Sequence, residues 1–390
     1  MPVPNRIADF HPEMTAWRRD IHTHPEIGFE EVRTSAIVAE KLESWGIEVH
    51  RGIGRTGVVG VLRGAREGKG SIGLRADMDA LPMTEVNSFA HRSQIPGKMH
   101  ACGHDGHTAM LLGAAKYLAE TRNFAGTVNF IFQPGEEGYA GAAAMIKDGL
   151  FERFPCDAVY GIHNDPTAPL GVTRAVAGVV MANSDILAIR IKGRGGHGAQ
   201  PHRTVDPILV GTQVIAGLQA IVSRRTDPLD SAVVSITQFH AGSADNVIPG
   251  EAELRGTVRT LTAATRDAVE QAIKDIATLT ARAHGAEAEV EYTRLYPAAV
   301  NHGEETNRAA RAIGAVVGDD KVIRSAPPVM GGEDFAFMLE QRPGAFLFVG
   351  QAGPDGQCGT PVHHPAYDFN DELLPVGAAY FARLVEQELS

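Results

Sequence analysis

The feature that most constrains the fold is an alternation of short apolar runs with amphipathic helical patterns. The runs at 57–62, 71–75 and 127–132 have the length and composition of strands, and a helical pattern at 107–120 separates the second from the third. Strands that alternate with helices in this way favour an α/β layer with a mostly parallel central sheet. The same alternation returns after Pro297. The sequence therefore predicts the α/β class, with helices flanking the sheet.

Residues 184–296 show a different order of predicted strands and helices. They contain four strand-like runs and two long helical patterns, at 207–222 and 263–284, which suit an independent α+β unit. A chain of 390 residues also exceeds what one hydrophobic core usually serves. We therefore expect a discontinuous domain formed by 1–183 and 297–390. An inserted domain at 184–296, with a four-stranded sheet and two helices, would interrupt it.

Two patterns near the N-terminus concern local structure. The segment 10–45 reads as helical, and Gly46 follows as a stop. Glycines in the segment 52–57 then match the G-x-G-x-x-G spacing of dinucleotide-binding loops. A β-rich run follows at 58–62, whereas that motif requires a helix, so we do not expect nucleotide binding.

The composition limits the classes of partner. A formal net charge of -11 argues against nucleic acid or an anionic membrane as the main partner. The hydrophobic fraction of 44% and charged fraction of 21% are typical of a globular protein. Three cysteines are too few for a disulfide framework, and the first residues lack the apolar core of a signal peptide. The sequence therefore predicts a reduced, cytoplasmic protein.

Side chains that bind metal ions occur in five short segments, each after a predicted strand or in a glycine-rich loop. Open α/β sheets place their binding sites at such positions. The segments hold Asp77 and Asp79, Cys102 and His104, Glu136 and Glu137, His163, and the pair His363 and His364. Together they offer nitrogen, oxygen and sulfur ligands in sufficient number for two divalent ions.

Each segment alone is ambiguous, because aspartates often cap turns and a single histidine is often a core residue. The most specific one is the cluster 100–107, with three histidines, one cysteine and one aspartate in eight residues. The adjacent carboxylates of Glu136 and Glu137 could divide the work beside a metal. One would bind the ion, while the other takes a proton from water.

The motifs around these residues resemble those of the aminoacylase, hippurate hydrolase and auxin-conjugate hydrolase group of dinuclear metallopeptidases. The matching segments are RRDIHTHPE at 18–26, RADMDALP at 75–82, MHACGHDGH at 99–107, QPGEE at 133–137, GRGGH at 193–197, NVIP at 246–249, GTVRT at 256–260, MGGEDF at 330–335 and HHPAYDFN at 363–370. They follow the order of the family along nearly the whole chain. The resemblance implies a metal-dependent amidohydrolase whose catalytic domain is interrupted by a smaller lid domain.

The resemblance also implies roles for single residues. The implied metal ligands are Cys102, His104, Glu137, His163 and His363, which would hold two divalent ions per subunit. Glu136 is the implied general base, which activates water and later protonates the leaving amine, and Asp79 is the carboxylate that orients the ligands. Sulfur favours zinc, and the other ligands suit manganese equally well, with cobalt and nickel as further candidates.

In the inserted domain the resemblance implies substrate-binding residues. His197, in a glycine-rich loop, would donate a hydrogen bond to the substrate carbonyl or oxyanion, commonly across a dimer. Arg259 and Asn246 would bind the free α-carboxylate, since a guanidinium can pair with a carboxylate through two hydrogen bonds. The implied assembly is a homodimer or a higher homo-oligomer.

Two positions depart from the wider pattern. The last ligand motif normally has one histidine, whereas here His364 follows His363; alignment to Pro365 and Tyr367 selects His363, with His364 as the alternative. Cys102 separates the chain from the carboxylate-bridged dipeptidases and carboxypeptidases of the superfamily. This favours N-acyl-L-amino acids, of the hippurate or N-acetyl type, as substrates.

Three other functions fit parts of the pattern. A metallo-dipeptidase or aminopeptidase that acts on short unblocked peptides would use the same ligands. A cysteine hydrolase would use Cys102 as nucleophile and His104 as base, but it leaves Glu137 and His163 without a role. A non-catalytic, metal-stabilised binding protein would have no need of Glu136.

Overall fold

The computed structural model describes residues 3–390, and the chain divides into two compact units. The larger unit comprises Met1–Val180, Val300–Pro327 and Asp334–Ser390, and the smaller unit comprises Met181–Ala299 and Pro328–Glu333. The sequence-based division counted the segment 328–333 with the larger unit. The segment belongs with the smaller unit because the backbone N–H of Ala182 donates to the carbonyl oxygens of Val329 (3.1 Å) and Gly331 (3.0 Å).

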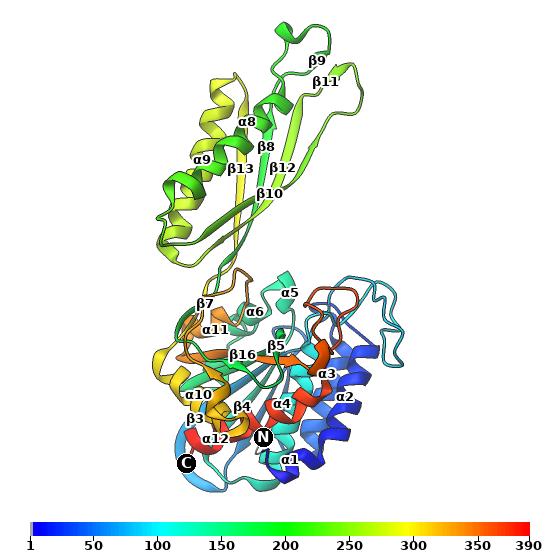
Figure 1. The fold of residues 1–390 in the computed structure, drawn as a ribbon, viewed down its shortest axis with the longest axis vertical. Coiled ribbons are helices and arrows are strands. Elements are labelled where there is room, and N and C mark those ends of the chain that lie inside the picture. Colours follow the sequence, from blue (N-terminus) through cyan, green and yellow to red (C-terminus); the bar gives the residue numbers. More distant parts are fainter. Residues whose placement is uncertain (1–2) are drawn as a thin grey trace. The chain divides into compact units, whose positions relative to one another are not determined.

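Eight strands form the sheet of the larger unit (Figure 1). Their order is β1 (Glu48–Ile53), β2 (Gly57–Arg63), β4 (Ala125–Gln133), β3 (Arg66–Asp77), β5 (Ala158–Pro169), β16 (Gly344–Ala352), β6 (Thr173–Arg174) and β15 (Val322–Ile323). The central strands β4, β3, β5 and β16 are parallel, whereas β1 and β2 pair antiparallel at one edge. The predicted α/β class with a mostly parallel central sheet is confirmed.

Four helices of the larger unit pack side by side. In order they are α2 (His11–Thr23), α4 (His104–Thr121), α12 (Leu374–Glu388) and α10 (Gly303–Val317). Every residue of α4 from His104 to Ala115 is buried. A helix that is buried on all sides lies inside the protein core, so the first turn of α4, which carries His104, is held by packing in every direction.

The helical region predicted at 10–45 is broken into α2 and α3 (Val32–Ser44). The break was not predicted. It follows from Pro25, which has no N–H to donate and disfavours helical backbone at the residue before it. The carboxylate of Glu26 then accepts hydrogen bonds from two backbone amides in the first turn of α3, at 2.9 and 2.8 Å. These amides have no partner within the helix, so Glu26 fixes where α3 begins.

The smaller unit has a four-stranded antiparallel sheet. Its order is β10 (Ala232–Ala241), β12 (Glu251–Thr260), β8 (Ser184–Lys192) and β13 (Glu287–Tyr296), and α8 (Pro207–Ala220) and α9 (Ala263–Ala283) pack against it. These are the four strands and two helices that the sequence predicted. Alternation along β8 places Leu187, Ile189 and Ile191 in the core, all at 0% exposure, and period-two alternation is the signal of a half-buried strand.

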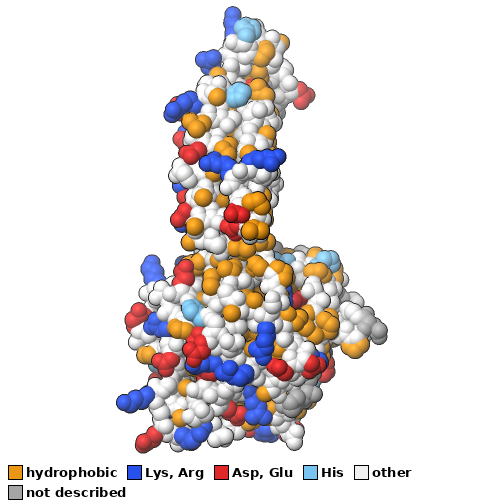
Figure 2. All heavy atoms as spheres, turned by 60° about the vertical axis from the view of Figure 1, so that its left-hand side comes forward, with side chains coloured by type: hydrophobic (Ala, Val, Ile, Leu, Met, Phe, Trp, Pro, Cys, Tyr) orange, Lys and Arg blue, Asp and Glu red, His pale blue; other side chains and the backbone are white. Residues whose placement is uncertain are grey.

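The smaller unit also contains the one segment among residues 3–390 that is long and apolar enough to cross a membrane. It is Pro207–Arg225, with a mean hydropathy of 1.2. Its side chains Val210, Val214 and Leu218 pack in the core of the unit. On the face of this unit drawn in Figure 2, hydrophobic side chains lie between charged ones. One face of the segment therefore packs against the sheet of its own unit.

Two short features complete the fold. A two-stranded ribbon of β9 (Gly196–His197) and β11 (Val247–Ile248) lies at one end of the smaller unit, beyond β8 and β12 (Figure 1). The sequence analysis did not predict it. In the larger unit, the glycines at 52–57 connect the antiparallel strands β1 and β2. No helix begins there, so the segment lacks the helix that a dinucleotide-binding loop requires.

Candidate metal centre

The ligand-bearing segments converge because the central strands are parallel. β3 ends at Asp77, β4 ends at Gln133, and β5 carries His163. The carboxyl ends of parallel strands meet at the same edge of a sheet. His104, the first residue of α4, lies at this edge too, since its Nδ1 is 2.9 Å from the carbonyl oxygen of Asp79. The loops that follow the strands therefore form one site.

The five predicted ligands lie together in two overlapping groups. We call Cys102, His104 and His163 the inner group, and Cys102, Glu137 and His363 the outer group. Within each group the ligand atoms lie within 4.8 Å of one another. Sγ of Cys102 is 3.3 Å from Nε2 of His163, and Nε2 of His363 is 3.2 Å from Oε1 of Glu137. The thiol of Cys102 belongs to both groups.

The two histidines of the inner group present the same ring nitrogen to the centre. Nδ1 of His104 and Nδ1 of His163 lie 2.9 and 2.7 Å from backbone carbonyl oxygens. A carbonyl only accepts, so each Nδ1 carries a proton, and in the neutral ring Nε2 keeps its lone pair. Nε2 of His104 is buried and has no hydrogen-bond partner within the described part of the chain. Buried polar atoms are normally paired, so this arrangement fits bound cations.

The charges at the centre also favour a cation. Burial alone lowers the pKa of His104, but the charge of Asp77 and the hydrogen bond to Asp79 outweigh it and raise that pKa to about 10. Burial and the neighbouring His107 lower the pKa of His163 to about 3, which leaves its imidazole neutral. The negative charge that attracts a proton to His104 attracts a divalent ion in the same way.

The thiol of Cys102 argues against the cysteine-hydrolase alternative. Burial, together with the charges of Glu137 and Glu136, raises the pKa of this thiol well above its usual range. A cysteine nucleophile needs the opposite shift. A bound cation would reverse the effect, because a thiol that coordinates a metal loses its proton. The surroundings of Cys102 therefore suit a metal ligand better than a nucleophile.

Asp79 connects the segments that carry the ligands. Its carboxylate is 1% exposed. Oδ1 accepts a hydrogen bond from the backbone N–H of Glu136 (3.0 Å), and Oδ2 accepts one from that of Glu137 (2.9 Å). Oδ1 also lies 3.3 Å from Nδ1 of His104. One carboxylate thus orients both a histidine and the two-glutamate loop, which is how residues behind metal ligands commonly act.

Glu136 lies on a tight turn beside the ligands. Its side chain is 6% exposed, and its carboxylate lies within 4.8 Å of the ligand atoms of His104 and Glu137. The turn ends at Ala140, whose φ of 56° is in the left-handed region, at a cost of roughly 1–2 kcal/mol for a residue with a Cβ atom. Such strain persists only where the surrounding structure holds it. The surrounding structure therefore holds the turn that carries Glu136 in this conformation.

The sequence analysis missed a buried network behind the inner group. Nδ1 of His107 lies 2.6 Å from Oδ1 of Asp77, and Nε2 of His107 lies 2.8 Å from Oδ1 of Asn164. Nη1 of Arg75 donates to Asp77 at 2.8 Å. A signal for His107 existed, because it lies one helical turn after His104 and so faces the same side of α4. Asn164 and Arg75 carried no comparable signal.

Of the two adjacent C-terminal histidines, His363 lies in the outer group. Its backbone N–H donates to the carbonyl oxygen of Ala101 (2.7 Å), next to Cys102, and its φ is 63°. Nδ1 of His364 accepts instead from the backbone N–H of Ala366 (3.1 Å). Of the pair, His363 is therefore the histidine that lies close to Cys102 and Glu137.

The three predicted substrate-binding residues lie in the smaller unit. His197 on β9 pairs with Val247 on β11, and the backbone N–H of Gly198 donates to the carbonyl oxygen of Asn246 (2.7 Å). His197 and Asn246 are therefore neighbours. Nδ1 of His197 accepts from the backbone N–H of Ala199 (3.0 Å), so Nε2 carries the proton of the neutral ring and can donate it.

Arg259 is not brought together with this pair. The ribbon leads into Glu251, the first residue of β12, and Arg259 is the ninth residue of that strand. At about 3.3 Å per residue, eight steps along β12 span roughly 26 Å. Nη1 of Arg259 donates to the carbonyl oxygen of Val258 (3.0 Å). Within one copy of the smaller unit, Arg259 and the His197–Asn246 pair thus lie at opposite ends of β12.

Comparison with known proteins agrees with this geometry. The sequence pattern of peptidase family M20/M25/M40 matches residues 73–387. Hippurate hydrolase from Campylobacter jejuni is 43% identical over 378 residues, which are 97% of each chain. Thermostable carboxypeptidase 1 from Saccharolobus solfataricus is 38% identical over 372 residues, 94% of this chain and 93% of the other.

A solved structure extends the similarity to both units. The crystal structure of a dinuclear metal binding peptidase of the M20 family from Bacillus subtilis has 37% sequence identity and a TM-score of 0.84. The match covers 98% of this chain and 99% of the other. The two ligand groups described above suit a centre with two divalent metal ions. The chain belongs to peptidase family M20/M25/M40 and is a metal-dependent hydrolase.

Proposed function

We propose that this hydrolase cleaves the amide bond of N-acyl-L-amino acids, such as hippurate or N-acetyl amino acids, and releases a carboxylic acid and a free amino acid. The observation that carries the proposal is that the inner and outer groups share Cys102, with the buried carboxylate of Glu136 beside them. The name of the Campylobacter jejuni relative supports the substrate class, since hippurate is an N-acylated glycine.

The proposed ions are held by the inner and outer groups. Divalent ions bound there would make water more acidic and polarise the amide carbonyl. The sulfur of Cys102 suits Zn²⁺, whereas the imidazoles and the carboxylate of Glu137 suit Mn²⁺ equally well. We therefore take Mn²⁺ or Zn²⁺ as the ions, with Co²⁺ and Ni²⁺ as further candidates.

Glu136 is the proposed general base. Its carboxylate would take a proton from the attacking water and later deliver it to the leaving nitrogen. Asp79, through its hydrogen bond to the backbone N–H of Glu136 (3.0 Å), would keep that carboxylate directed at the ligands. Groups placed in this way contribute about 10²- to 10⁴-fold to the rate of hydrolysis.

The smaller unit supplies the proposed contacts to the substrate. The protonated Nε2 of His197 suits a developing oxyanion, and the guanidinium of Arg259 suits the free α-carboxylate, with Asn246 as a further donor. Because Arg259 lies at the other end of β12 from His197 and Asn246, a substrate that touches all three would need two copies of the chain. This separation supports the proposed homodimer.

A substrate panel tests the proposal. Protein loaded with Mn²⁺ is assayed with hippurate, N-acetyl amino acids, unblocked dipeptides and N-blocked peptides, and kcat/KM is compared. We expect the highest values for the N-acyl amino acids. A clear preference for unblocked dipeptides would support the dipeptidase alternative instead. A preference for N-blocked peptides would support a carboxypeptidase, the activity in the name of the Saccharolobus solfataricus relative.

A further inference from the structure

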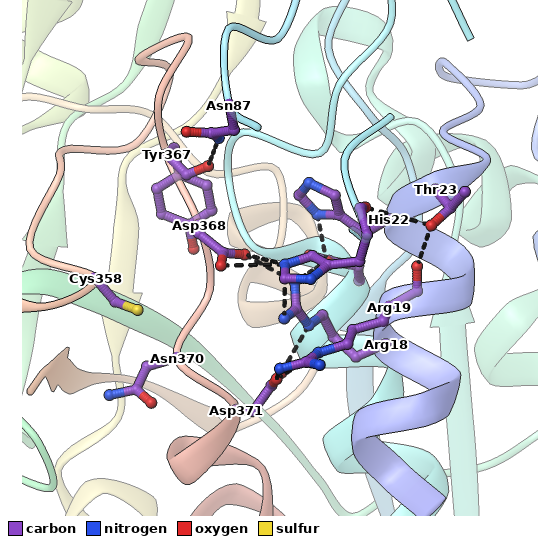
Figure 3. A network of polar contacts seen from close by, with 12 residues as sticks. Arg18, Arg19, His22, Thr23, Asn87, Cys358, Tyr367, Asp368, Asn370 and Asp371 are labelled. Atoms are coloured by element: carbon purple, nitrogen blue, oxygen red, sulfur yellow. Dashed lines mark hydrogen bonds and ion pairs between the residues drawn. The ribbon is translucent and has the colours of Figure 1, made fainter. Parts of the chain in front are cut away.

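A buried ionic network joins α2 to two segments that carry metal-ligand positions (Figure 3). Arg18 on α2 is its centre, and the side chain of this arginine is 1% exposed. Nη1 lies 2.9 Å from Oδ1 of Asp368 and 3.6 Å from Oδ2 of Asp105, and Nε donates to Oδ1 of Asp371 at 2.8 Å. One guanidinium therefore contacts three carboxylates from two segments that are far apart in the sequence.

These carboxylates lie close to the ligand positions along the chain. Asp105 directly follows His104 in the first turn of α4. Asp368 and Asp371 belong to the same C-terminal segment as His363. Arg18 is thus a direct link between a segment of the inner group and a segment of the outer group.

The segment that carries His363 depends on such links for its position. The side chain of His363 is 53% exposed, so packing alone does not fix it. The side-chain amide of Gln351 donates to the carbonyl oxygens of Cys358 (2.8 Å) and Asp368 (3.1 Å) and so holds the backbone of the segment. The contacts of Arg18 with Asp368 and Asp371 hold its side chains, as Figure 3 shows.

The inner group has stronger local support. His104 and His163 are each fixed by a hydrogen bond from Nδ1 to a backbone carbonyl, at 2.9 and 2.7 Å. Nδ1 of His363 has no such bond within the described residues, and the backbone at His363 is in the left-handed region, with a φ of 63°. A non-glycine residue adopts that region only when its surroundings hold it there. The position of the outer group is therefore the more sensitive of the two.

The charges explain why an arginine occupies this position. Burial disfavours its charged form, but Asp105, Asp368 and Asp371 together keep the pKa of Arg18 above its ordinary value. His22 lies beside it and contacts Asp105 at 2.8 Å. Buried ion pairs contribute little net stability, because the loss of hydration offsets the attraction. Their geometry is nevertheless demanding, since a buried carboxylate without a partner is costly.

We propose that Arg18 is a positioning residue that sets the spacing of the two ligand-bearing segments, and that its loss weakens the outer metal site selectively. The proposal rests on the two-ion centre proposed above. The inner site should persist, because its histidines keep their own hydrogen bonds and Asp105 remains held by His22 (2.8 Å).

The test is a calorimetric titration of the metal-free protein with Mn²⁺ alone. Wild type is compared with Arg18→Met and with the matched control Arg19→Met. Arg19 lies on the same helix and contacts the same Asp371 (2.9 Å), but its side chain is 50% exposed. We expect wild type and Arg19→Met to bind two ions alike. Arg18→Met should bind one ion as wild type does and the other roughly 10- to 100-fold more weakly.

Two outcomes would overturn the proposal: equal weakening of both sites in Arg18→Met, or no weakening of either. A wild-type protein that binds fewer than two ions would instead contradict the two-ion centre itself. If Arg18→Met does not fold, as judged by circular dichroism, Asp368→Asn takes its place. This variant removes one negative charge that pairs with Arg18, at a side chain that is 23% exposed, and the same selective loss is expected. Parallel weakening of both sites in Asp368→Asn would be equally decisive against the proposal.

Discussion

The two units hold their functional residues in opposite ways. In the larger unit Asp79 is 1% exposed and fixes two backbone amides and an imidazole, and Glu136 is 6% exposed. In the smaller unit His197 and Asn246 are exposed on a ribbon with two residues per strand, and Arg259 is half-buried on a sheet. The first set is locked by buried hydrogen bonds, whereas the second lies largely at the surface.

This difference in burial corresponds to a difference in proposed role. The larger unit carries the groups proposed to act on water, and the smaller unit carries groups proposed to contact the substrate. Groups that stabilise charge or move protons work best when they need not rearrange during the reaction, which burial and hydrogen bonding ensure. Groups that first meet a substrate must be reachable from solvent. We therefore expect changes in the larger unit to act on metal content and kcat, and changes at Arg259 and Asn246 in the smaller unit to act on KM.

Removal of the metal ions has the largest expected effect. Treatment with a chelator should abolish hydrolysis and lower the midpoint of thermal unfolding, because the ligands of both groups lose their common partner. Addition of Mn²⁺ or Zn²⁺ should restore both properties. Metal content and turnover are measured on the same samples. Hydrolysis that persists in metal-free protein would show that the reaction does not need ions bound at the ligand groups of the larger unit. That result would contradict the contrast drawn between the two units.

Glu136→Gln should have the next largest effect. We expect kcat to fall by about 10²- to 10⁴-fold with no change in metal content, because the amide group cannot accept the proton of water. Turnover is compared with that of Glu152→Gln, a matched change at an exposed position of the same unit. Near-normal turnover of Glu136→Gln would exclude this residue from the mechanism.

The buried network of the larger unit should make its stability depend on pH. Burial lowers the pKa of His22, but Asp105 and Glu85 outweigh it and raise that pKa to about 9. A folded pKa above the unfolded value of about 6.5 stabilises the fold below that pH, and the stabilisation is lost as the pH rises through 9. The expected loss is up to about 3 kcal/mol.

Denaturant unfolding at about pH 6 and about pH 10 measures this loss in wild type and in His22→Gln, which has no titrating ring at that position. The wild-type protein should lose more stability over the interval. An identical pH dependence in both proteins would show that His22 does not act as described.

Arg259→Ala should have the smallest effect and the one most confined to binding. We expect KM for N-acyl amino acids to rise about 10- to 100-fold, because a charged hydrogen bond contributes roughly 1.5–3 kcal/mol. Amide substrates without the carboxylate should show little change. Arg255→Ala, at an exposed position of the same strand, is the control. Equal effects of Arg259→Ala on both kinds of substrate would contradict the proposed contact between Arg259 and the substrate carboxylate.

Much of the fold and the ligand set could be predicted because the signals are local. The alternation along β8 gives a strand directly, and the parallel sheet follows from the order of strands and helices. Cys102 and His104 stand in a short motif, and Glu137 and His163 each follow a run that the sequence predicts as a strand, so each could be found without a structure. The choice between His363 and His364 needed either the motif or the geometry.

The rest depends on contacts between residues that are distant in the sequence. Arg18 and Asp371 are 353 positions apart, and no local pattern links them. The separation of Arg259 from Asn246 follows from the register of β12, which the sequence does not state. The break between α2 and α3 depends on the hydrogen bonds that the carboxylate of Glu26 accepts from the first backbone amides of α3, and a sequence pattern does not show these bonds.

The place of β16 has a consequence for the synthesis of the chain. β16 lies between β5 and β6, yet it follows the entire smaller unit in the sequence. As the chain leaves the ribosome, β5 keeps one open edge while most of the inserted segment is already complete and able to fold. The last strand must then enter the middle of a sheet that is already partly formed, and His363 arrives only after it. A nascent chain of this protein can therefore complete its insert before the ligand positions of its larger unit are brought together.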